Sequence, residues 1–189
     1  MNRLKKIVAI GPESTGKSTL CSQLATHYHT KWVPEYARKF LEVNADYKYD
    51  DLLTIAKGQI QLEEVITNSF EVAARSGDKS RLDGSNKNNL LFIDTDMYVM
   101  QVWCEFVYNR CHNWILSQIA TRKYDGYLLC NIDLPWEQDG MREYPDRKVR
   151  EKLFHFYREL MINQNVPWIE ISGDHDERLQ NAIQFVDKL

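Results

Sequence analysis

The fold of this chain is decided by one stretch near its start, Ile7-Val8-Ala9-Ile10-Gly11-Pro12-Glu13-Ser14-Thr15-Gly16-Lys17-Ser18-Thr19. It opens with four apolar residues that stop at a glycine, which is typical of a strand buried on both faces of a parallel sheet. A glycine-rich loop follows, and a helical pattern then runs from Lys17 to about His29. The spacing G-x-x-x-x-G-K-S between a strand and a helix predicts a phosphate-binding loop, or P-loop.

A P-loop holds its ligand with backbone and side chains together. Backbone N–H groups surround phosphate oxygens, and the helix N-terminus adds positive potential. We expect Lys17 to neutralise the β and γ phosphates of a nucleoside triphosphate and the Ser18 hydroxyl to bind Mg²⁺. A degenerate loop that binds no nucleotide is the alternative, although every signature residue is present. The predicted nucleotide contacts in the loop are Gly11, Glu13, Ser14, Thr15, Gly16, Lys17, Ser18 and Thr19.

The composition narrows the class of protein. The 189 residues suit one hydrophobic core, so we expect a single domain over 1–189. The net charge is −3 and the basic residues are scattered, which argues against a nucleic-acid partner. The sequence has neither a signal-peptide pattern nor the roughly 20 apolar residues that a membrane helix needs. We therefore expect a cytoplasmic protein without a membrane partner, and the oligomeric state is left open.

Strand-like and helical patterns alternate along the rest of the chain. Strands are predicted at 31–33, 90–93, 127–130 and 167–171. Helices are predicted at 35–43, 50–74, 97–108, 112–122, 146–163 and from 174 onward. This alternation predicts an α/β fold, a parallel five-stranded sheet with helices on both faces.

Two polar segments interrupt the pattern. Residues 75–89 contain one apolar residue in fifteen, so they are expected to form a mobile surface loop. Residues 134–147 are rich in proline, glycine and charge and are expected to act as a lid. Of the lid arginines Arg142, Arg147 and Arg150, at least one is expected to cover phosphate charge. Trp136 is either a stacking surface for a flat acceptor or a packing residue.

Acidic side chains follow the predicted strands, at the edge where ligands of parallel sheets bind. Asp94 is expected to help anchor Mg²⁺ with Ser18, with a helix N-cap as the compatible alternative. Asp96 is a candidate for acceptor binding or for the base, against simple capping. Glu35 stands one helical turn before Arg38, so the pair can present an acid and a cation together, with a surface ion pair as the alternative.

Two small residues follow the last predicted strand. Ser172 and Gly173 are candidates for adenine contacts because they lie at the same sheet edge.

Four blocks of sequence, in this order, resemble one family. They are GPESTGKST at 11–19, EYAR at 35–38, FIDTD at 92–96 and PWEQDGMR at 135–142. Together they resemble the ribosylnicotinamide kinase domain of the bacterial NAD-biosynthesis regulator NadR and its stand-alone AAA-type ATPase relatives. The resemblance covers nearly the whole chain, and the last three blocks are more specific than the first.

The resemblance implies an adenylate-kinase-like P-loop NTPase fold with a lid, and a phosphotransferase with an alcohol acceptor. The implied reaction moves the γ-phosphate of ATP to the ribose 5′-hydroxyl of nicotinamide riboside, a step of pyridine nucleotide salvage in NAD biosynthesis. Full regulators of this kind carry a DNA-binding domain and an adenylyltransferase domain ahead of the kinase, so repression and adenylyl transfer are expected to be absent here.

Residue roles also follow from the resemblance. Asp94 and Asp96 take metal or acceptor roles, Glu35 and Arg38 line the acceptor pocket, and the base stays open between Glu35 and Asp96. Trp136 and Arg142 belong to the lid. The predicted catalytic set is Lys17, Glu35, Asp96 and Arg142.

Two other functions fit the same P-loop. One is a nucleotide-dependent ATPase or switch that acts on a protein partner, and the other is a kinase of a different nucleoside-like acceptor.

Overall fold

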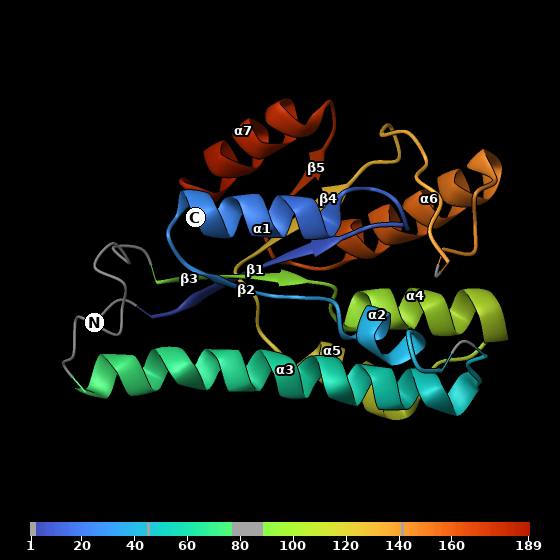
Figure 1. Cartoon of the computed structure of the whole chain (residues 1–189), viewed down its shortest axis with the longest axis horizontal. Helices are drawn as coiled ribbons and strands as arrows, with labels where there is room; N and C mark the ends of the chain where they lie inside the picture. Colours follow the sequence, from blue (N-terminus) through green and yellow to red (C-terminus); the bar gives the residue numbers. More distant parts are fainter. Residues whose placement is uncertain (1–2, 45, 77–88, 141) are drawn as a thin grey trace.

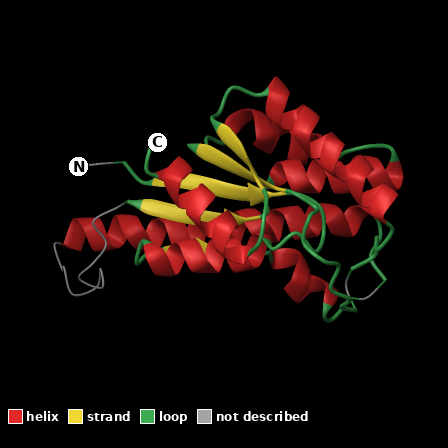
Figure 2. Ribbon diagram, turned by 90° about the horizontal axis from the view of Figure 1, so that it is seen from above, coloured by secondary structure: helices red, strands yellow, loops and turns green. Residues whose placement is uncertain are grey.

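The computed structural model describes residues 3–44, 46–76, 89–140 and 142–189, and its centre is a parallel sheet of five strands in the order β2-β3-β1-β4-β5. The strands are β1 (Lys5–Ile10), β2 (Lys31–Val33), β3 (Leu90–Asp94), β4 (Gly126–Cys130) and β5 (Trp168–Ile171). Every strand pair is parallel, so the carboxyl ends of the strands meet at one edge of the sheet. Figure 1 shows the sheet between two groups of helices, and Figure 2 shows the strands side by side. The predicted fold class is confirmed.

The helices agree with the sequence patterns to within a few residues. They are α1 (Lys17–His27), α2 (Tyr36–Leu41), α3 (Tyr49–Ser76), α4 (Met97–Tyr108), α5 (Asn113–Thr121), α6 (Arg147–Asn163) and α7 (His175–Val186). The segment 75–89, predicted as a surface loop, begins inside α3, and its residues 77–88 lie outside the described part of the chain.

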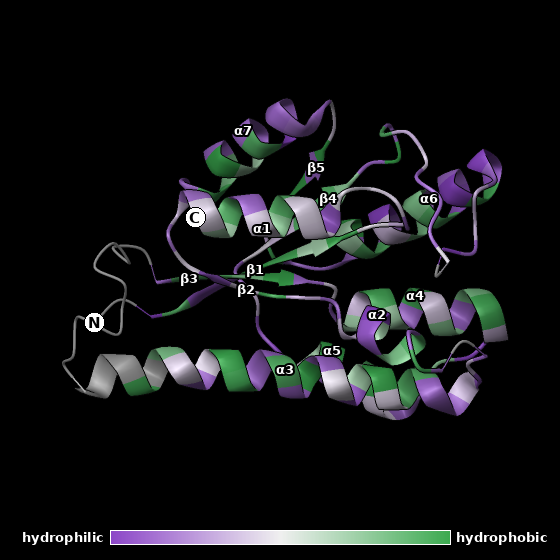
Figure 3. Cartoon of the chain, in the orientation of Figure 1, coloured by the Kyte–Doolittle hydropathy of each residue, from purple (hydrophilic) through white to green (hydrophobic). Residues whose placement is uncertain are grey.

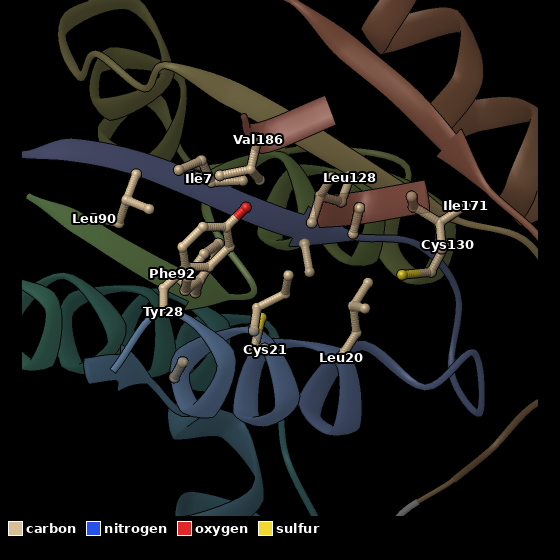
Figure 4. Packing of buried hydrophobic residues seen from close by; sticks show 14 residues of the cluster. Ile7, Leu20, Cys21, Tyr28, Leu90, Phe92, Leu128, Cys130, Ile171 and Val186 are labelled. Carbon is tan, nitrogen blue, oxygen red and sulfur yellow. The ribbon is translucent and has the colours of Figure 1, made fainter. Parts of the chain in front are cut away.

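Helices α1 and α7 cover one face of the sheet. Ile7 of β1, Phe92 of β3 and Leu128 of β4 are fully buried on this side. Figure 4 shows these side chains packed with Leu20 of α1 and Val186 of α7. Burial of this apolar surface fixes α1, and with it the loop that precedes α1, against the sheet.

Helices α3, α4 and α6 cover the opposite face. Val8 and Ile10 of β1 point to this side and are as deeply buried as their neighbours on the first face. The wholly apolar run at residues 7–10 of β1 is thus explained, because successive side chains enter different cores. The helices carry both hydrophilic and hydrophobic colours in Figure 3, as expected for elements with one face against a sheet.

A third apolar cluster lies beside the sheet, among α2, α3, α4 and α5. Leu52, Met100 and Ile115 are its fully buried members from three of these helices. The cluster holds α2 and α4 next to the carboxyl ends of β2 and β3, where the polar residues of the site begin. Within the described ranges, no helix combines the length and the apolar character needed to cross a membrane.

Candidate functional site

The P-loop needs its glycines at two positions. Gly11 has φ +138°, and a Cβ atom there would lie 2.6 Å from the carbonyl oxygen of Cys130. Gly16 adopts a left-handed conformation with φ 76° as the N-cap of α1. A side chain at Gly11 would collide with β4, and at Gly16 it would strain the backbone. The turn that aims the N-terminus of α1 at the loop therefore depends on both glycines.

Side chains of the loop bond to the loop backbone and to the end of β3. The Thr15 hydroxyl donates to the carbonyl oxygen of Pro12 at 2.8 Å, and Lys17 Nζ donates to the same oxygen at 2.9 Å. The Ser18 hydroxyl donates to Asp94 Oδ2 at 2.5 Å. Lys17 therefore has only a carbonyl dipole as its hydrogen-bond partner among the described residues, and its charge is available for an anion.

A pocket of about 440 Å³ opens over the P-loop, within the range of small-molecule sites. Every residue from 11 to 19 lines it, so all of the P-loop contacts predicted from the sequence lie at this pocket. Glu35, Arg38 and Arg142 also line the pocket, from segments distant in the chain. The structure thus brings together the glycine loop, the acid–cation pair after β2 and one lid arginine.

The opposite wall of the pocket is apolar and aromatic. It is formed by Ala37, Leu41, Val99, Val102, Trp103, Phe106, Leu153 and Tyr157, which come from α2, α4 and α6. The indole Nε1 of Trp103 donates to Tyr47 Oη at 2.8 Å, and the two rings meet edge to face at 4.9 Å. This anchoring holds the ring of Trp103 in place as part of the wall.

None of these eight wall residues was predicted as a site residue, although the four from α4 carry a signal. Val99, Val102, Trp103 and Phe106 stand at i, i+3, i+4 and i+7 on α4, directly after the FIDTD block. Such a stripe is ordinarily read as core. Its position just beyond the carboxyl end of β3 was the available indication that it faces the ligand edge.

Asp94 lies at the end of β3 and is fully buried. Burial, and next the charge of Glu35, raises the pKa of Asp94 to about 6, against the lowering effect of Lys17. A carboxylate and a hydroxyl oxygen form the kind of oxygen donor set that Mg²⁺ prefers. The pair of Ser18 and Asp94 therefore fits the predicted Mg²⁺ site, and a cation there would offset the repulsion between Asp94 and Glu35.

Glu35 and Asp96 both occupy helix N-cap positions, but only the Asp96 side chain makes a capping hydrogen bond within the described chain. Asp96 is 2% exposed and caps α4, accepting from Tyr98 N at 2.9 Å and from the Tyr127 hydroxyl at 3.0 Å. Burial raises its pKa to about 7. Glu35 is the N-cap of α2, yet its side chain makes no capping bond within the described chain and lines the pocket. Asp94 and Asp96 both lie outside the pocket lining, and Asp96 is engaged in capping, whereas the Glu35 carboxylate lines the pocket.

The predicted lid segment rests on the P-loop. Glu13 Oε2 accepts the backbone N–H groups of Glu143 at 2.9 Å and Tyr144 at 3.2 Å. The backbone N–H of Glu137 donates to the Ser14 hydroxyl oxygen at 2.9 Å. Met141 of this segment lies outside the described residues. The bonds place the chain on both sides of position 141 directly over the phosphate end of the pocket.

The three arginines of the lid region have different surroundings. Arg147 is largely exposed and pairs with Glu151 at 3.0 Å, one helical turn away. Arg142 lines the pocket, donates to the Ser14 hydroxyl at 3.3 Å and pairs with Asp139 at 3.1 Å.

Arg150 is buried and has no ion pair within the described part of the chain. It donates to the Ser14 carbonyl oxygen at 3.2 Å, while its Nε is buried without a hydrogen-bond partner. Burial, followed by the charges of Arg142 and Arg147, lowers the pKa of Arg150. The charge of Glu13 acts in the opposite direction and raises this pKa, and Arg150 lies outside the pocket lining. A buried guanidinium beside the P-loop without an ion pair among the described residues is suited to receive an anion.

Trp136, Ser172 and Gly173 lie away from the pocket lining. The Trp136 ring faces the Arg150 guanidinium at 5.2 Å, and its Nε1 donates to Gln138 Oε1 at 3.0 Å. The Ser172 hydroxyl oxygen accepts from Asn131 Nδ2 at 3.0 Å. The three residues predicted to touch an acceptor ring or adenine are thus absent from the pocket lining, which His175, after β5, reaches.

The side chain of Arg178 links the Ser172-Gly173 turn to the P-loop, and we call this set of bonds the Arg178 brace. Arg178 of α7 is 3% exposed and donates to the carbonyl oxygens of Thr15 at 2.9 Å, Gly173 at 2.8 Å and Asn131 at 3.0 Å. It also contacts Asp133. These bonds tie the ends of β4 and β5 to the P-loop.

Curated relatives are similar to the chain over nearly its whole length. It is 24% identical over 192 residues to the trifunctional NAD biosynthesis/regulator protein NadR of Escherichia coli (strain K12), covering 98% of this chain and 43% of that protein. The NadR protein of Salmonella typhimurium matches with the same identity and coverage. The chain thus spans less than half the length of the curated relatives it matches.

Solved structures share the fold. A crystal structure of NadR protein in complex with NR superposes with a TM-score of 0.69 at 21% identity, over 97% of this chain and 49% of that one. Thymidylate kinase from Ehrlichia chaffeensis gives a TM-score of 0.61 at 12% identity, over 96% and 98% of the two chains. A deoxyadenosine kinase from M. mycoides with bound dATP gives 0.56 at 12% identity, over 97% and 99%. A model of the AAA domain family matches residues 6–178, and the chain therefore belongs to this family of P-loop proteins.

Proposed function

We propose that the protein is an ATP-dependent kinase of a nucleoside-like acceptor, with the 5′-hydroxyl of nicotinamide riboside as its substrate group. One observation carries the proposal. A single pocket joins the P-loop and Lys17 to the carboxylate of Glu35 and to a wall of apolar and aromatic side chains. A phosphoryl donor and a flat, partly apolar acceptor would meet within it.

The phosphate end would bind ATP through the P-loop. Lys17 would neutralise the β and γ phosphates, and Ser18 with Asp94 would hold Mg²⁺. When bound, Mg²⁺ supplies positive charge to the phosphate oxygens. Arg142 and Arg150 lie on the lid side of Ser14 and would cover charge on the moving phosphoryl group. Arg142 lines the pocket, and Arg150, which lies outside the lining, has no ion pair within the described ranges that would compete with a phosphate.

The acceptor end would hold the nucleoside. Its ring would pack against Trp103 and Phe106 of α4, since aromatic side chains stack on flat rings. Glu35 would accept the proton of the acceptor hydroxyl as that oxygen forms its bond to the γ-phosphorus and the bond to the β-phosphate oxygen breaks, releasing ADP. Glu35 is preferred over Asp96 as the base because the Asp96 carboxylate is already committed to two hydrogen bonds. Arg38 lines the same end and would contact the acceptor.

The comparisons support this choice of acceptor. One NadR crystal structure contains NR, and a second contains NAD and AMP-PNP and superposes with a TM-score of 0.67. The names of the other two similar proteins describe kinases of a thymidine nucleotide and of deoxyadenosine. The identities are low, so the base carried by the acceptor is part of the proposal.

The test is a phosphorylation assay with purified protein. ATP, Mg²⁺ and a panel of nicotinamide riboside, thymidine, deoxyadenosine and uridine are incubated with wild type and Lys17→Ala, and mass spectrometry identifies the product. We expect nicotinamide mononucleotide from wild type alone, with the highest kcat/KM for nicotinamide riboside. Preference for another nucleoside would retain the kinase and overturn the acceptor. Hydrolysis of ATP that no acceptor stimulates would overturn the kinase and favour an ATPase that acts on a protein partner.

A further inference from the structure

Gln59 is a buried amide in the middle of α3, and it links the two strand ends that carry Glu35 and Asp94. Its side chain is 2% exposed. The Oε1 atom accepts from the backbone N–H of Tyr36 at 2.7 Å. The Nε2 atom donates to the carbonyl oxygens of Asp94 at 3.1 Å and Pro34 at 3.4 Å. A single side chain thus bonds to the backbone on both sides of Glu35 and to the end of β3.

The two carbonyl groups need such a donor because the ladder between β2 and β3 ends just before them. The last aligned pair is Val33 and Ile93. Pro34 follows and has no N–H, so the ladder cannot continue from this residue. Buried carbonyl groups without a donor destabilise a fold. Gln59 supplies the donor and keeps the two chain segments at a fixed separation beyond the sheet.

The hydrogen bond from the Tyr36 N–H to Gln59 fixes the backbone next to Glu35. Tyr36 is the first residue of α2, and Glu35 is its N-cap. An N-cap side chain ordinarily accepts a backbone N–H of the first turn, as Asp96 does for α4. In α2 the Gln59 carbonyl oxygen accepts the N–H of Tyr36, one position before the N–H groups that an N-cap side chain ordinarily accepts. The Glu35 side chain makes no capping bond within the described chain and lines the pocket.

Gly58 makes the close approach of α3 possible. A Cβ atom at this position would lie 2.2 Å from the Tyr36 ring. Glycine inside a helix is unfavourable relative to alanine, so its presence indicates a packing requirement. The ring of Tyr36 lies against the bare backbone of α3, which brings Gln59 within reach of the chain around Glu35.

Thr95 holds the Glu35 side chain from the other direction. It has φ 74° and is 2% exposed, an unfavourable conformation for a β-branched residue. Its hydroxyl donates to Glu35 Oε1 at 3.4 Å and lies 3.5 Å from Asp94 Oδ1. The backbone of Glu35 is thus fixed by Gln59 and its carboxylate by Thr95.

We propose that Gln59 is a positioning residue for phosphoryl transfer, which holds the Glu35 carboxylate toward the acceptor hydroxyl by fixing the backbone on both sides of Glu35. The inference rests on the proposed function of Glu35 as the base. It assigns to α3, which contributes no residue to the pocket lining within the described ranges, a role in turnover.

The test compares Gln59→Met, Gln59→Glu and the control Gln61→Met in wild-type and Glu35→Gln backgrounds. Gln61 is an exposed residue of the same helix, so its variant controls for the loss of an amide from α3. Gln59→Glu retains an acceptor for Tyr36 N but loses the two donated bonds. We expect Gln59→Met to lower kcat about 10- to 100-fold with the dissociation constant for ATP within about twofold of wild type. Gln59→Glu should fall between Gln59→Met and wild type, and Gln61→Met should equal wild type.

The Glu35→Gln background separates positioning from general stability. We expect Gln59→Met to cause no further loss of kcat there, since the base that it positions is gone. Equal losses in both backgrounds, or a parallel loss of ATP affinity, would assign Gln59 a structural role and overturn the inference.

Crystal structures of wild type and the Gln59 variants provide a readout that does not need turnover. We expect the Glu35 carboxylate to leave the Thr95 hydroxyl in Gln59→Met, and an unmoved carboxylate would contradict the inference. If Gln59→Met does not fold, Gln59→Glu serves in both measurements. A wild type without kinase activity would remove the proposed function, while the crystal structures would still decide whether Gln59 positions Glu35.

Discussion

The two ends of the pocket are built in different ways. The phosphate end is a single stretch of nine residues, 11–19, whose backbone turns are set by Gly11 and Gly16. The acceptor end is assembled from α2, α4 and α6, which lie far apart in the sequence. A backbone site of this kind depends on local chain geometry, whereas the side-chain wall depends on how three helices pack. Substitutions should therefore affect one end without the other.

Lys17→Ala is expected to have the largest effect on the phosphate end and little effect on stability. Loss of the cation that faces the β and γ phosphates should lower kcat/KM by about 10³-fold or more. The melting temperature should stay within a few degrees, because Lys17 bonds only to the Pro12 carbonyl oxygen among the described residues. Steady-state kinetics and a thermal scan measure the two effects, and isothermal titration measures the affinity for ATP, with the exposed Lys188→Ala as control. Unchanged ATP affinity would contradict the placement of phosphates at this end.

Glu35→Gln tests whether Glu35, which lies between the two ends of the pocket, is the general base. We expect kcat to fall about 10²- to 10⁴-fold while the affinity for ATP stays unchanged, since a general base acts on the acceptor. Steady-state kinetics and ATP titration measure the change. Asp96→Asn is the matched variant, because asparagine is an equally good N-cap. Its kcat should remain within about threefold of wild type, and a larger loss in Asp96→Asn than in Glu35→Gln would reverse the assignment of the base.

Arg150→Met should lower the affinity of the phosphate end for ATP. Because the guanidinium is buried beside Ser14 without an ion pair in the described residues, we expect ATP affinity to fall about 10- to 100-fold and ADP affinity to fall less. Titrations with both nucleotides measure the difference. Arg147→Met, on the same helix but paired with Glu151 in solvent, should change neither value by more than about twofold. Equal effects of the two substitutions would remove Arg150 from the phosphate site.

Trp103→Ala should affect the acceptor end alone. We expect the KM for the nucleoside to rise about tenfold, from loss of an aromatic wall, with ATP affinity retained. Initial-rate kinetics with each substrate varied in turn measure the effect. Trp114→Ala removes a partly buried tryptophan outside the pocket lining and controls for the cost of truncation. A rise in the KM for ATP of the same size would show that the two ends are not separable here.

The smallest effect on turnover and a distinct effect on stability are expected at Asp96. Its pKa of about 7 in the fold lies above the value near 3.9 of an unfolded chain, so the folded state binds more protons between these values. Stability from this group is complete below about pH 4 and is lost as pH rises through 7. The unfolding free energy of wild type should therefore fall relative to Asp96→Asn across this window, by on the order of 2–4 kcal/mol. Denaturant titrations at pH 4.5 and 7.5 test this, and parallel values would contradict it.

Much of the fold could be predicted because its strands and helices follow from patterns of neighbouring residues in the sequence. The five strands and the starts of α4 and α7 follow from apolar runs and capping residues, and Asp174 forms the capping box that its position before α7 predicts. The predicted nucleotide contacts in the P-loop are adjacent in sequence, and all of them line the pocket.

Other residues could not be placed because their surroundings come from distant segments. Trp136 turns to Arg150, and the Ser172-Gly173 turn is tied to the Arg178 brace. Asp96 and Glu35 look alike as acids after strands. They differ because Tyr127 and the first turn of α4 engage Asp96, whereas the Glu35 side chain makes no capping bond within the described chain and Gln59 of α3 holds the backbone beside it.

The sequence by itself determined a parallel α/β fold and a phosphate-binding loop, because both rest on periodicity and on glycines at fixed spacing. Only the tertiary structure decided which acid faces the pocket, which lid arginine lacks an ion pair within the described chain, and which aromatic residues form the acceptor wall. The physical reason is that a side chain's role depends on whether its hydrogen bonds and charge are already satisfied by neighbours. Those neighbours are brought together by packing across the sheet edge.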